Sequence, residues 1–108
     1  DEIIKEVHFK KPDVANYQKF ANPASRYAIA GVYVAKHGGE VRVAVTGAGP
    51  NAYRWTEAET ALGSNFSADA LAALSVEASD LNADIHASAD YRAHLVEVMA
   101  RRAVQACA

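Results

Sequence analysis

Residues 84–104 read DIHASADYRAHLVEVMARRAV, a pattern typical of a capped amphipathic helix. The Ser88 hydroxyl can accept a hydrogen bond from an otherwise unpaired N–H of the first turn. Asp90 follows in that turn, where the helix dipole favours a negative charge. The apolar residues recur at helical spacing and form one stripe, which comprises Tyr91, Leu95, Val98 and Met99. The segment therefore predicts a long C-terminal helix that packs through this stripe.

Two arginines interrupt the stripe. Arg102 falls in its middle and Arg92 on its edge. A guanidinium at such a position must extend to solvent or pair with a carboxylate. Asp84 and Asp90 are the nearest carboxylates in the sequence, so we consider an ion pair between Arg92 and one of them as a hypothesis.

The first half of the chain has the patterns of β-strands. Valines at positions 41, 43 and 45 alternate with other residues, which predicts a half-buried strand. Residues 29–36 predict a partner strand, and Gly38-Gly39 supplies the positive φ that a two-residue hairpin turn needs. The apolar residues within Glu2–Phe9 favour an additional first strand.

The segments between these strands are less regular. Residues 17–20 are ambiguous between strand and turn, and residues 22–25 can start a brief helical turn, since Pro23 suits a first helical position.

Two shorter helices are expected between the hairpin and the C-terminal helix. Thr56 and Glu59 have the spacing of a capping box, and Gly63 suits a left-handed helix end. Ser67 is placed to cap the next helix, with Phe66 before it as half of a hydrophobic staple. We therefore predict one domain over residues 1–108. Its α+β fold has an antiparallel sheet of about three to four strands and a layer of about three helices on one face.

Composition narrows the classes of function. Half of the residues are apolar and 22% are charged, which is typical of a globular domain. The net charge is −2 with mixed signs, so a nucleic-acid partner is not expected. No apolar run has the length of a membrane span. The single cysteine, Cys107, excludes an internal disulfide and fits a reducing compartment, which we expect to be the cytoplasm. Because the chain starts at Asp1 without Met, we expect a fragment of a longer protein.

Three segments resemble one known family. The C-terminal segment is similar to the pattern Asp-x-x-x-Ser/Gly-x-x-Tyr-Arg-x-x-Leu-x-x-Val-x-x-Arg-Arg-Ala. This pattern closes the FAD-binding medium subunit of molybdenum hydroxylases, as in carbon monoxide dehydrogenase-like enzymes and, in related form, xanthine dehydrogenase. Tyr17–Phe20 with Ser25–Val32 is similar to the Tyr-x-Lys segment of that family and the alanine-rich stretch after it. Arg54-x-x-Glu57-Ala58-Glu59 resembles its short helix after the sheet.

The resemblance implies a C-terminal domain that covers the FAD pocket and packs on an N-terminal FAD-binding domain of the same chain. Its further partners would be an iron–sulfur small subunit and a molybdopterin large subunit, which send electrons to FAD. In the family a lysine near position 19 lies by the isoalloxazine ring. Lys19 would thus place a positive charge there, stabilising an anionic reduced flavin and raising its potential, and Arg26 is a second, weaker candidate. Since the Gly-rich FAD-phosphate loops of the family are missing, the 108-residue chain should bind FAD weakly or not at all.

Other catalytic readings are less well supported by the residues. Asp84, His86 and Ser88 are the residue types of a hydrolase triad, but they lie within five residues and Ser88 already suits a cap. His86 and His94 lack the spacing of a metal site. Gly47-Ala48-Gly49 is followed by Pro50, which favours a plain turn over a phosphate loop. We therefore assign no catalytic residue and no metal ligand.

Two alternative functions remain open. The chain could be a free-standing α+β interaction or dimerisation domain without catalysis. It could also be a small hydrolase, in which case replacing Ser88 by Ala would abolish turnover. Glycine-rich loops in a preceding segment of about 150–200 residues, the size of a further domain, would favour the flavoprotein.

Overall fold

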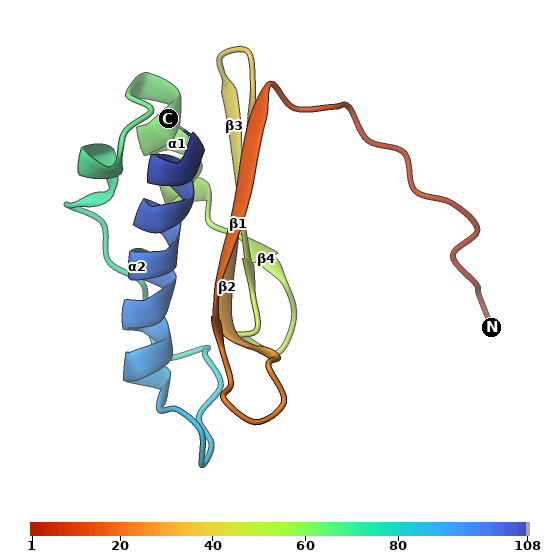
Figure 1. Ribbon diagram of the computed structural model, residues 1–108, viewed down its shortest axis with the longest axis vertical. Coiled ribbons are helices and arrows are strands. Elements are labelled where there is room, and N and C mark those ends of the chain that lie inside the picture. The colour runs from red at the N-terminus through yellow and green to blue at the C-terminus, as the bar shows by residue number, and fades with distance from the viewer. Residues whose placement is uncertain (108) are drawn as a thin grey trace.

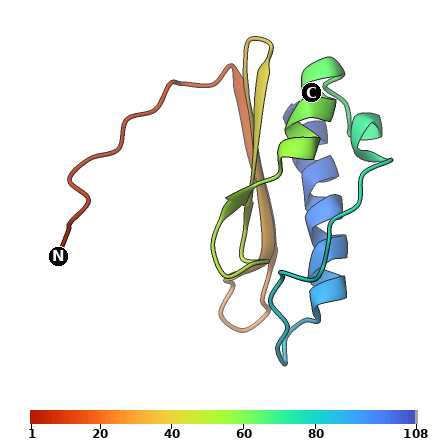
Figure 2. The same cartoon turned by 180° about the vertical axis from the view of Figure 1, so that it is seen from behind.

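The computed structural model describes residues 1–107 and has two layers, a sheet and a set of helices. The sheet is antiparallel with the order β1-β2-β3-β4, formed by Val14–Ala21, Ala28–His37, Glu40–Thr46 and Tyr53–Arg54. The α-helices are α1, Thr56–Ser64, and α2, Ala89–Cys107; a short 3-10 helix, η1, spans Ala68–Leu71. Figures 1 and 2 show that the helices cover only one face of the sheet. The predicted α+β class is confirmed, with two α-helices and one short turn of helix in place of about three helices.

The core lies between the central strands and the helices. Side chains alternate along β2 and β3, as the two-residue period of a strand requires. Val32 and Val34 of β2 are fully buried on the helix side, as are Val43 and Val45 of β3. Tyr33, between the two β2 valines, is 39% exposed on the other side. We call that other side the open face. It carries Tyr17, Lys19, Gly31, Tyr33, Arg42 and Thr46.

The predicted β2–β3 hairpin is confirmed. His37 pairs with Glu40, so Gly38 and Gly39 form a two-residue turn. Gly38 has φ of 62°, whereas Gly39 does not have a positive φ. A positive φ at the first central residue alone is the requirement of a type II′ turn, whose twist matches that of the flanking strands.

The first strand was predicted in the wrong place. Residues 1–11 are all exposed and extend away from the sheet, as Figure 1 shows, so the strand predicted within Glu2–Phe9 does not form. The ambiguous segment, residues 17–20, lies inside β1, which pairs with β2 from Val14 to Ala21. The alternation of apolar and polar residues before Lys10 is imperfect, since Ile3 and Ile4 are adjacent and only Val7-His8-Phe9 alternates, so the segment lacks a continuous apolar face.

The predicted Ser88 cap of α2 is confirmed, but the buried face of the helix differs from the predicted apolar stripe. Ser88 Oγ accepts a hydrogen bond of 3.1 Å from the N–H of Tyr91. Tyr91 itself is 43% exposed, whereas Arg92 is buried. Arg102 is exposed rather than central to the packed face. The buried face of α2 comprises Arg92, Ala93, Leu95, Val96, Met99, Ala100, Ala103 and Val104.

The predicted capping box of α1 is wrong. Trp55 occupies the N-cap position, so Thr56 is the first helical residue and no side chain caps the helix. Glu59 therefore does not reach back to a cap, and it binds elsewhere. Gly63 does not end the helix either, because α1 continues to Ser64 and Gly63 has no positive φ.

The second helix, predicted to begin after Ser67, is only the short 3-10 helix η1. Ser67 precedes it but makes no capping hydrogen bond, and its hydroxyl is buried without a partner among residues 1–107. After Leu71 the chain is irregular, and the N–H of Val76 donates to Glu97 Oε1 of α2 over 3.0 Å. Residues 22–25 form the predicted brief helical turn: the N–H of Arg26 donates to the carbonyl of Asn22 over 2.8 Å, and Asn22 Oδ1 accepts from the N–H groups of Ala24 and Ser25.

Candidate functional site

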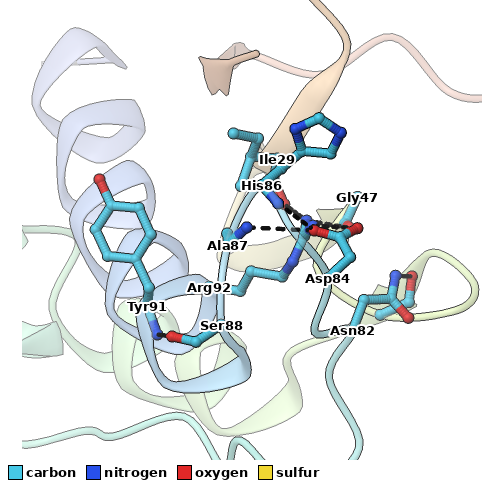
Figure 3. Close-up of polar contacts among 10 residues, drawn as sticks. Ile29, Gly47, Asn82, Asp84, His86, Ala87, Ser88, Tyr91 and Arg92 are labelled. Carbon is cyan, nitrogen blue, oxygen red and sulfur yellow. Dashed lines mark hydrogen bonds and ion pairs between the residues drawn. The ribbon is translucent and has the colours of Figure 1, made fainter.

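The segments that carry the sequence motifs meet at one end of the sheet. We call it the turn end. It is formed by the β1–β2 turn (residues 22–27), residues 47–49 after β3, and the loop of residues 82–88 before α2. A buried arginine on α2 joins the last two of these segments to the start of β2 (Figure 3).

Arg92 is 2% exposed and donates hydrogen bonds in two directions. Its Nη1 donates to the carbonyl of Ile29 on β2 over 2.6 Å and to that of Gly47 over 3.3 Å. Its Nη2 donates to both carboxylate oxygens of Asp84, each over 3.1 Å. Nε has no partner among residues 1–107. The hypothesis of an Arg92 ion pair is thus confirmed, with Asp84 rather than Asp90 as the partner.

Asp84 binds the backbone of its own loop as well as the guanidinium of Arg92. Its Oδ1 accepts hydrogen bonds from the N–H of His86 over 2.9 Å and from that of Ala87 over 3.2 Å (Figure 3). These backbone N–H groups, that of His86 first, hold the pKa of the Asp84 carboxyl below its usual range, and Arg92 adds to the effect. Asp84 is therefore held in the ionised form that Arg92 requires.

Asn82 joins the same loop to the end of β3. Its backbone N–H donates to the carbonyl of Ala48 over 2.8 Å, and its side-chain Nδ2 donates to that of Gly49 over 3.0 Å. Gly47 has φ of 75°, and a Cβ there would lie 2.3 Å from the carbonyl oxygen of Ala28. Only glycine fits this close approach. Residues 47–49 thus present their carbonyls to Arg92 and Asn82.

The contacts of Gly47–Gly49 are made by carbonyls, whereas a phosphate loop binds through backbone N–H groups, so nothing in these contacts favours a phosphate loop over a plain turn. The suggested triad does not form either. Asp84 is engaged by Arg92, and Ser88 Oγ caps α2. The His86 ring packs edge-on against Tyr27, with centroids 6.0 Å apart.

The two predicted cofactor residues lie together at the turn end. Lys19 Nζ donates to the carbonyl of Arg26 over 2.9 Å, and both side chains are exposed. Arg26 has φ of 65°, a left-handed conformation that non-glycine residues rarely adopt. The lysine is therefore attached to the turn while its remaining protons stay free for a ligand.

Tyr17 lies beside Lys19 on the open face. Its Oη is 2.9 Å from Thr46 Oγ1, and its ring crosses β2 at Gly31, where a Cβ would lie 2.3 Å from Oη. On the helix side, Phe20 packs edge-on against Tyr91 with centroids 6.2 Å apart. The turn end thus combines exposed aromatic rings with two cations.

These residues fit one part of a flavin and not another. An ammonium group and neighbouring tyrosine rings suit the polar edge and the plane of an isoalloxazine ring. The glycine turns have other contacts: Gly38-Gly39 closes the β2–β3 hairpin, and the carbonyls of Gly47 and Gly49 accept from Arg92 and Asn82.

A second charged contact joins β4 to α1, and it was not predicted from the sequence. Arg54 donates to Glu59 through Nε over 3.0 Å and through Nη2 over 2.5 Å. Glu59 Oε2 also accepts from the N–H of Val43 over 3.0 Å. The hydrogen bond from Arg54, and less so that from Val43, keeps the pKa of the Glu59 carboxyl below its usual value. The family-like Arg54-x-x-Glu57-Ala58-Glu59 segment contained the signal, which a capping-box interpretation obscured.

Fold and site define a small α+β domain in which a buried arginine joins a helix to the ends of two strands, beside an exposed group of tyrosines and cations. The chain belongs to the CO dehydrogenase flavoprotein C-terminal domain family, whose pattern it matches over residues 15–107. The resemblance drawn from the sequence is therefore confirmed. No curated protein and no solved structure gave a significant match.

Proposed function

We propose that this chain covers the FAD pocket of a flavoprotein subunit and packs on an FAD-binding domain that precedes it in the same polypeptide. Membership of the flavoprotein C-terminal domain family carries the proposal. The joined Lys19 and Arg26 of the turn end support it, because they offer positive charge without a phosphate loop. Residues 1–108 act as one domain of that subunit.

Lys19 and Arg26 are the residues that we assign to the cofactor. FAD, when bound, supplies the chemistry of accepting electrons from iron–sulfur clusters. Lys19 contributes a fixed positive charge, which favours negative charge on a neighbouring ring. The carbonyl of Arg26 orients the Lys19 ammonium, and the Arg26 guanidinium adds a second positive charge at the rim.

The proposed assembly is a molybdenum hydroxylase. Its iron–sulfur small subunit and molybdopterin large subunit pass electrons to the flavoprotein subunit. Within residues 1–107, no helix combines the length and the apolar character needed to cross a membrane. Cys107 is a free thiol, which agrees with the reducing cytoplasm that we propose as its location.

Lys19→Met in the full-length subunit tests the proposal. We expect a lower flavin midpoint potential with unchanged FAD content, because a positive charge beside the ring is lost. Lys11→Met is the matched control, since it removes an exposed lysine from the N-terminal segment. Equal potentials in both variants and the unmodified subunit would remove Lys19 from the cofactor site. Tight, stoichiometric FAD binding by the 108-residue chain would contradict the role of a cover.

A dimerisation function is the second candidate, and the N-terminal segment favours it. Ile3 is 94% exposed and Phe9 is 82% exposed, and Tyr33 on the open face is also accessible. Exposed apolar side chains of this size often mark protein contacts. Light scattering on the 108-residue chain separates the two candidates, because a stable dimer supports this one and a monomer at high concentration argues against it.

A further inference from the structure

A cleft of about 510 Å³ lies apart from the Lys19–Arg26 pair. Its walls are the β3–β4 loop and β4, the start of α1, and the segment Leu74–Leu81 that leads toward α2. Figure 2 shows this last segment in cyan, running alongside α2. The volume is within the range of small-molecule sites, roughly 300–1,000 Å³.

Apolar and aromatic side chains form the floor of the cleft. Trp55 is buried, and Leu74, Val76 and Leu81 are half-buried beside it. Tyr53 also lines the cleft, and the residue is 36% exposed. These surfaces suit the apolar or aromatic body of a ligand, and the tyrosine face can also attract a cation.

The charges that line the cleft are predominantly negative. Glu57, Glu77 and Asp80 are exposed at its rim, and none forms an ion pair within residues 1–107. Arg54 is the only cation in the lining, and its guanidinium is engaged by Glu59 through two hydrogen bonds. The carboxylates at the rim are therefore left without a counter-charge.

The Leu74–Leu81 wall of the cleft is attached to the rest of the fold near both of its ends. The N–H of Val76 donates to Glu97 on α2 over 3.0 Å. Asn82, directly after Leu81, is attached to Ala48 and Gly49 by its backbone and its side chain. A cleft whose walls are fixed before binding loses little conformational entropy when a ligand enters.

We propose that this cleft binds a small organic cation, an amine with an aromatic or apolar body. The body would pack on Trp55 and Tyr53, and the ammonium group would lie among Glu57, Glu77 and Asp80. The site is separate from the flavin-covering role and does not depend on it.

The test uses three probes of similar shape and different charge: phenethylamine, phenethyl alcohol and hydrocinnamate. Trp55 is the only tryptophan, so its fluorescence reports on the cleft directly. We expect a saturable fluorescence change with phenethylamine. The neutral alcohol should bind about tenfold more weakly, as judged by its Kd. The anion hydrocinnamate should give no saturable change. Amide chemical shifts should move in residues 49–55 and 74–81.

A variant carrying both Glu77→Gln and Asp80→Asn should lose most of the preference for phenethylamine over the alcohol, since only Glu57 remains of the three carboxylates. The matched control carries Asp69→Asn and Asp90→Asn, two exposed carboxylates outside the cleft, and should keep the preference. Equal affinity for all three probes, or no saturable response in fluorescence and chemical shifts, would overturn the proposal. A response to a trilysine peptide but not to phenethylamine would assign the cleft to a protein partner and overturn it as well.

Discussion

The guanidinium of Arg92 and the carboxylate of Asp84 form an ion pair whose two members have very different environments. The arginine side chain is 2% exposed, whereas the aspartate side chain is 46% exposed. Asp84 thus lies partly at the surface and pairs with the buried guanidinium of Arg92. The guanidinium also donates to the carbonyls of Ile29 and Gly47. Burial of such a charge is tolerated because every partner is an oxygen that accepts a hydrogen bond.

Replacing Arg92 by Ala should destabilise the domain by about 3 kcal/mol or more, because buried carbonyls lose their donor and a cavity remains. Asp84→Asn should cost less, since the amide oxygen can still accept hydrogen bonds and the side chain, 46% exposed, remains open to water. Arg102→Ala is the matched control on the same helix, and as an exposed site it should change the free energy of unfolding by less than about 0.5 kcal/mol. Urea unfolding measures all three, and equal effects at positions 92 and 102 would contradict the buried contact.

Glu59 should make stability depend on acid pH. Its pKa in the folded state is lower than the ordinary value of 4.5, chiefly because Arg54 donates to it. A group with a depressed folded pKa adds stability above its unfolded pKa, and this contribution is lost as the pH falls through the folded value. Unfolding free energies measured from neutral pH downward should therefore decline below about pH 4.5.

Glu59→Gln should remove part of that acid dependence, since a neutral amide does not titrate. Glu57→Gln is the matched control, because Glu57 is exposed on the same helix and makes no ion pair within residues 1–107. A steep acid dependence that survives in Glu59→Gln would show that other carboxylates control it. Asp84, whose pKa is also lowered, is the first of these to examine.

The parts of this fold that could be read from the sequence are those fixed by local pattern. Alternating valines and Gly38-Gly39 specify the hairpin, and Ser88 specifies the start of α2. Glu59 shows where local pattern fails. Its spacing from Thr56 allowed a capping box, but tertiary contacts with Arg54 and Val43 use the carboxylate instead.

Part of the candidate site could also be predicted from the sequence. Lys19 and Arg26 were identified through the family-like segments, and the turn between β1 and β2 brings them together. The cleft that Trp55 lines could not be predicted, because its walls come from segments about twenty residues apart in the sequence, which only the folded chain brings together.

Gly31→Ala should destabilise the domain by about 1–3 kcal/mol, the usual cost of overpacking. The added Cβ would lie 2.3 Å from Tyr17 Oη, so the tyrosine ring must move and its contact with Thr46 is lost. In a Tyr17→Ala background the obstructing ring is absent, and the cost of Gly31→Ala should fall. A double-mutant cycle by urea unfolding measures this coupling, and strictly additive effects would place the strain elsewhere.

In the second candidate function, dimerisation, the exposed N-terminal segment should contribute to association rather than to folding. Residues 1–9 make no strand and are all exposed, so their deletion should change the free energy of unfolding by less than about 0.5 kcal/mol. Lys10 is kept because its carbonyl lies 3.1 Å from His37 Nε2. Sedimentation velocity compares the self-association of the two chains.

A matched variant that keeps the full length but replaces Ile3, Ile4, Val7 and Phe9 by Ser should associate as weakly as the deleted chain, because the apolar side chains are the cause. Full self-association in that variant would instead assign the contact to the open face of the sheet.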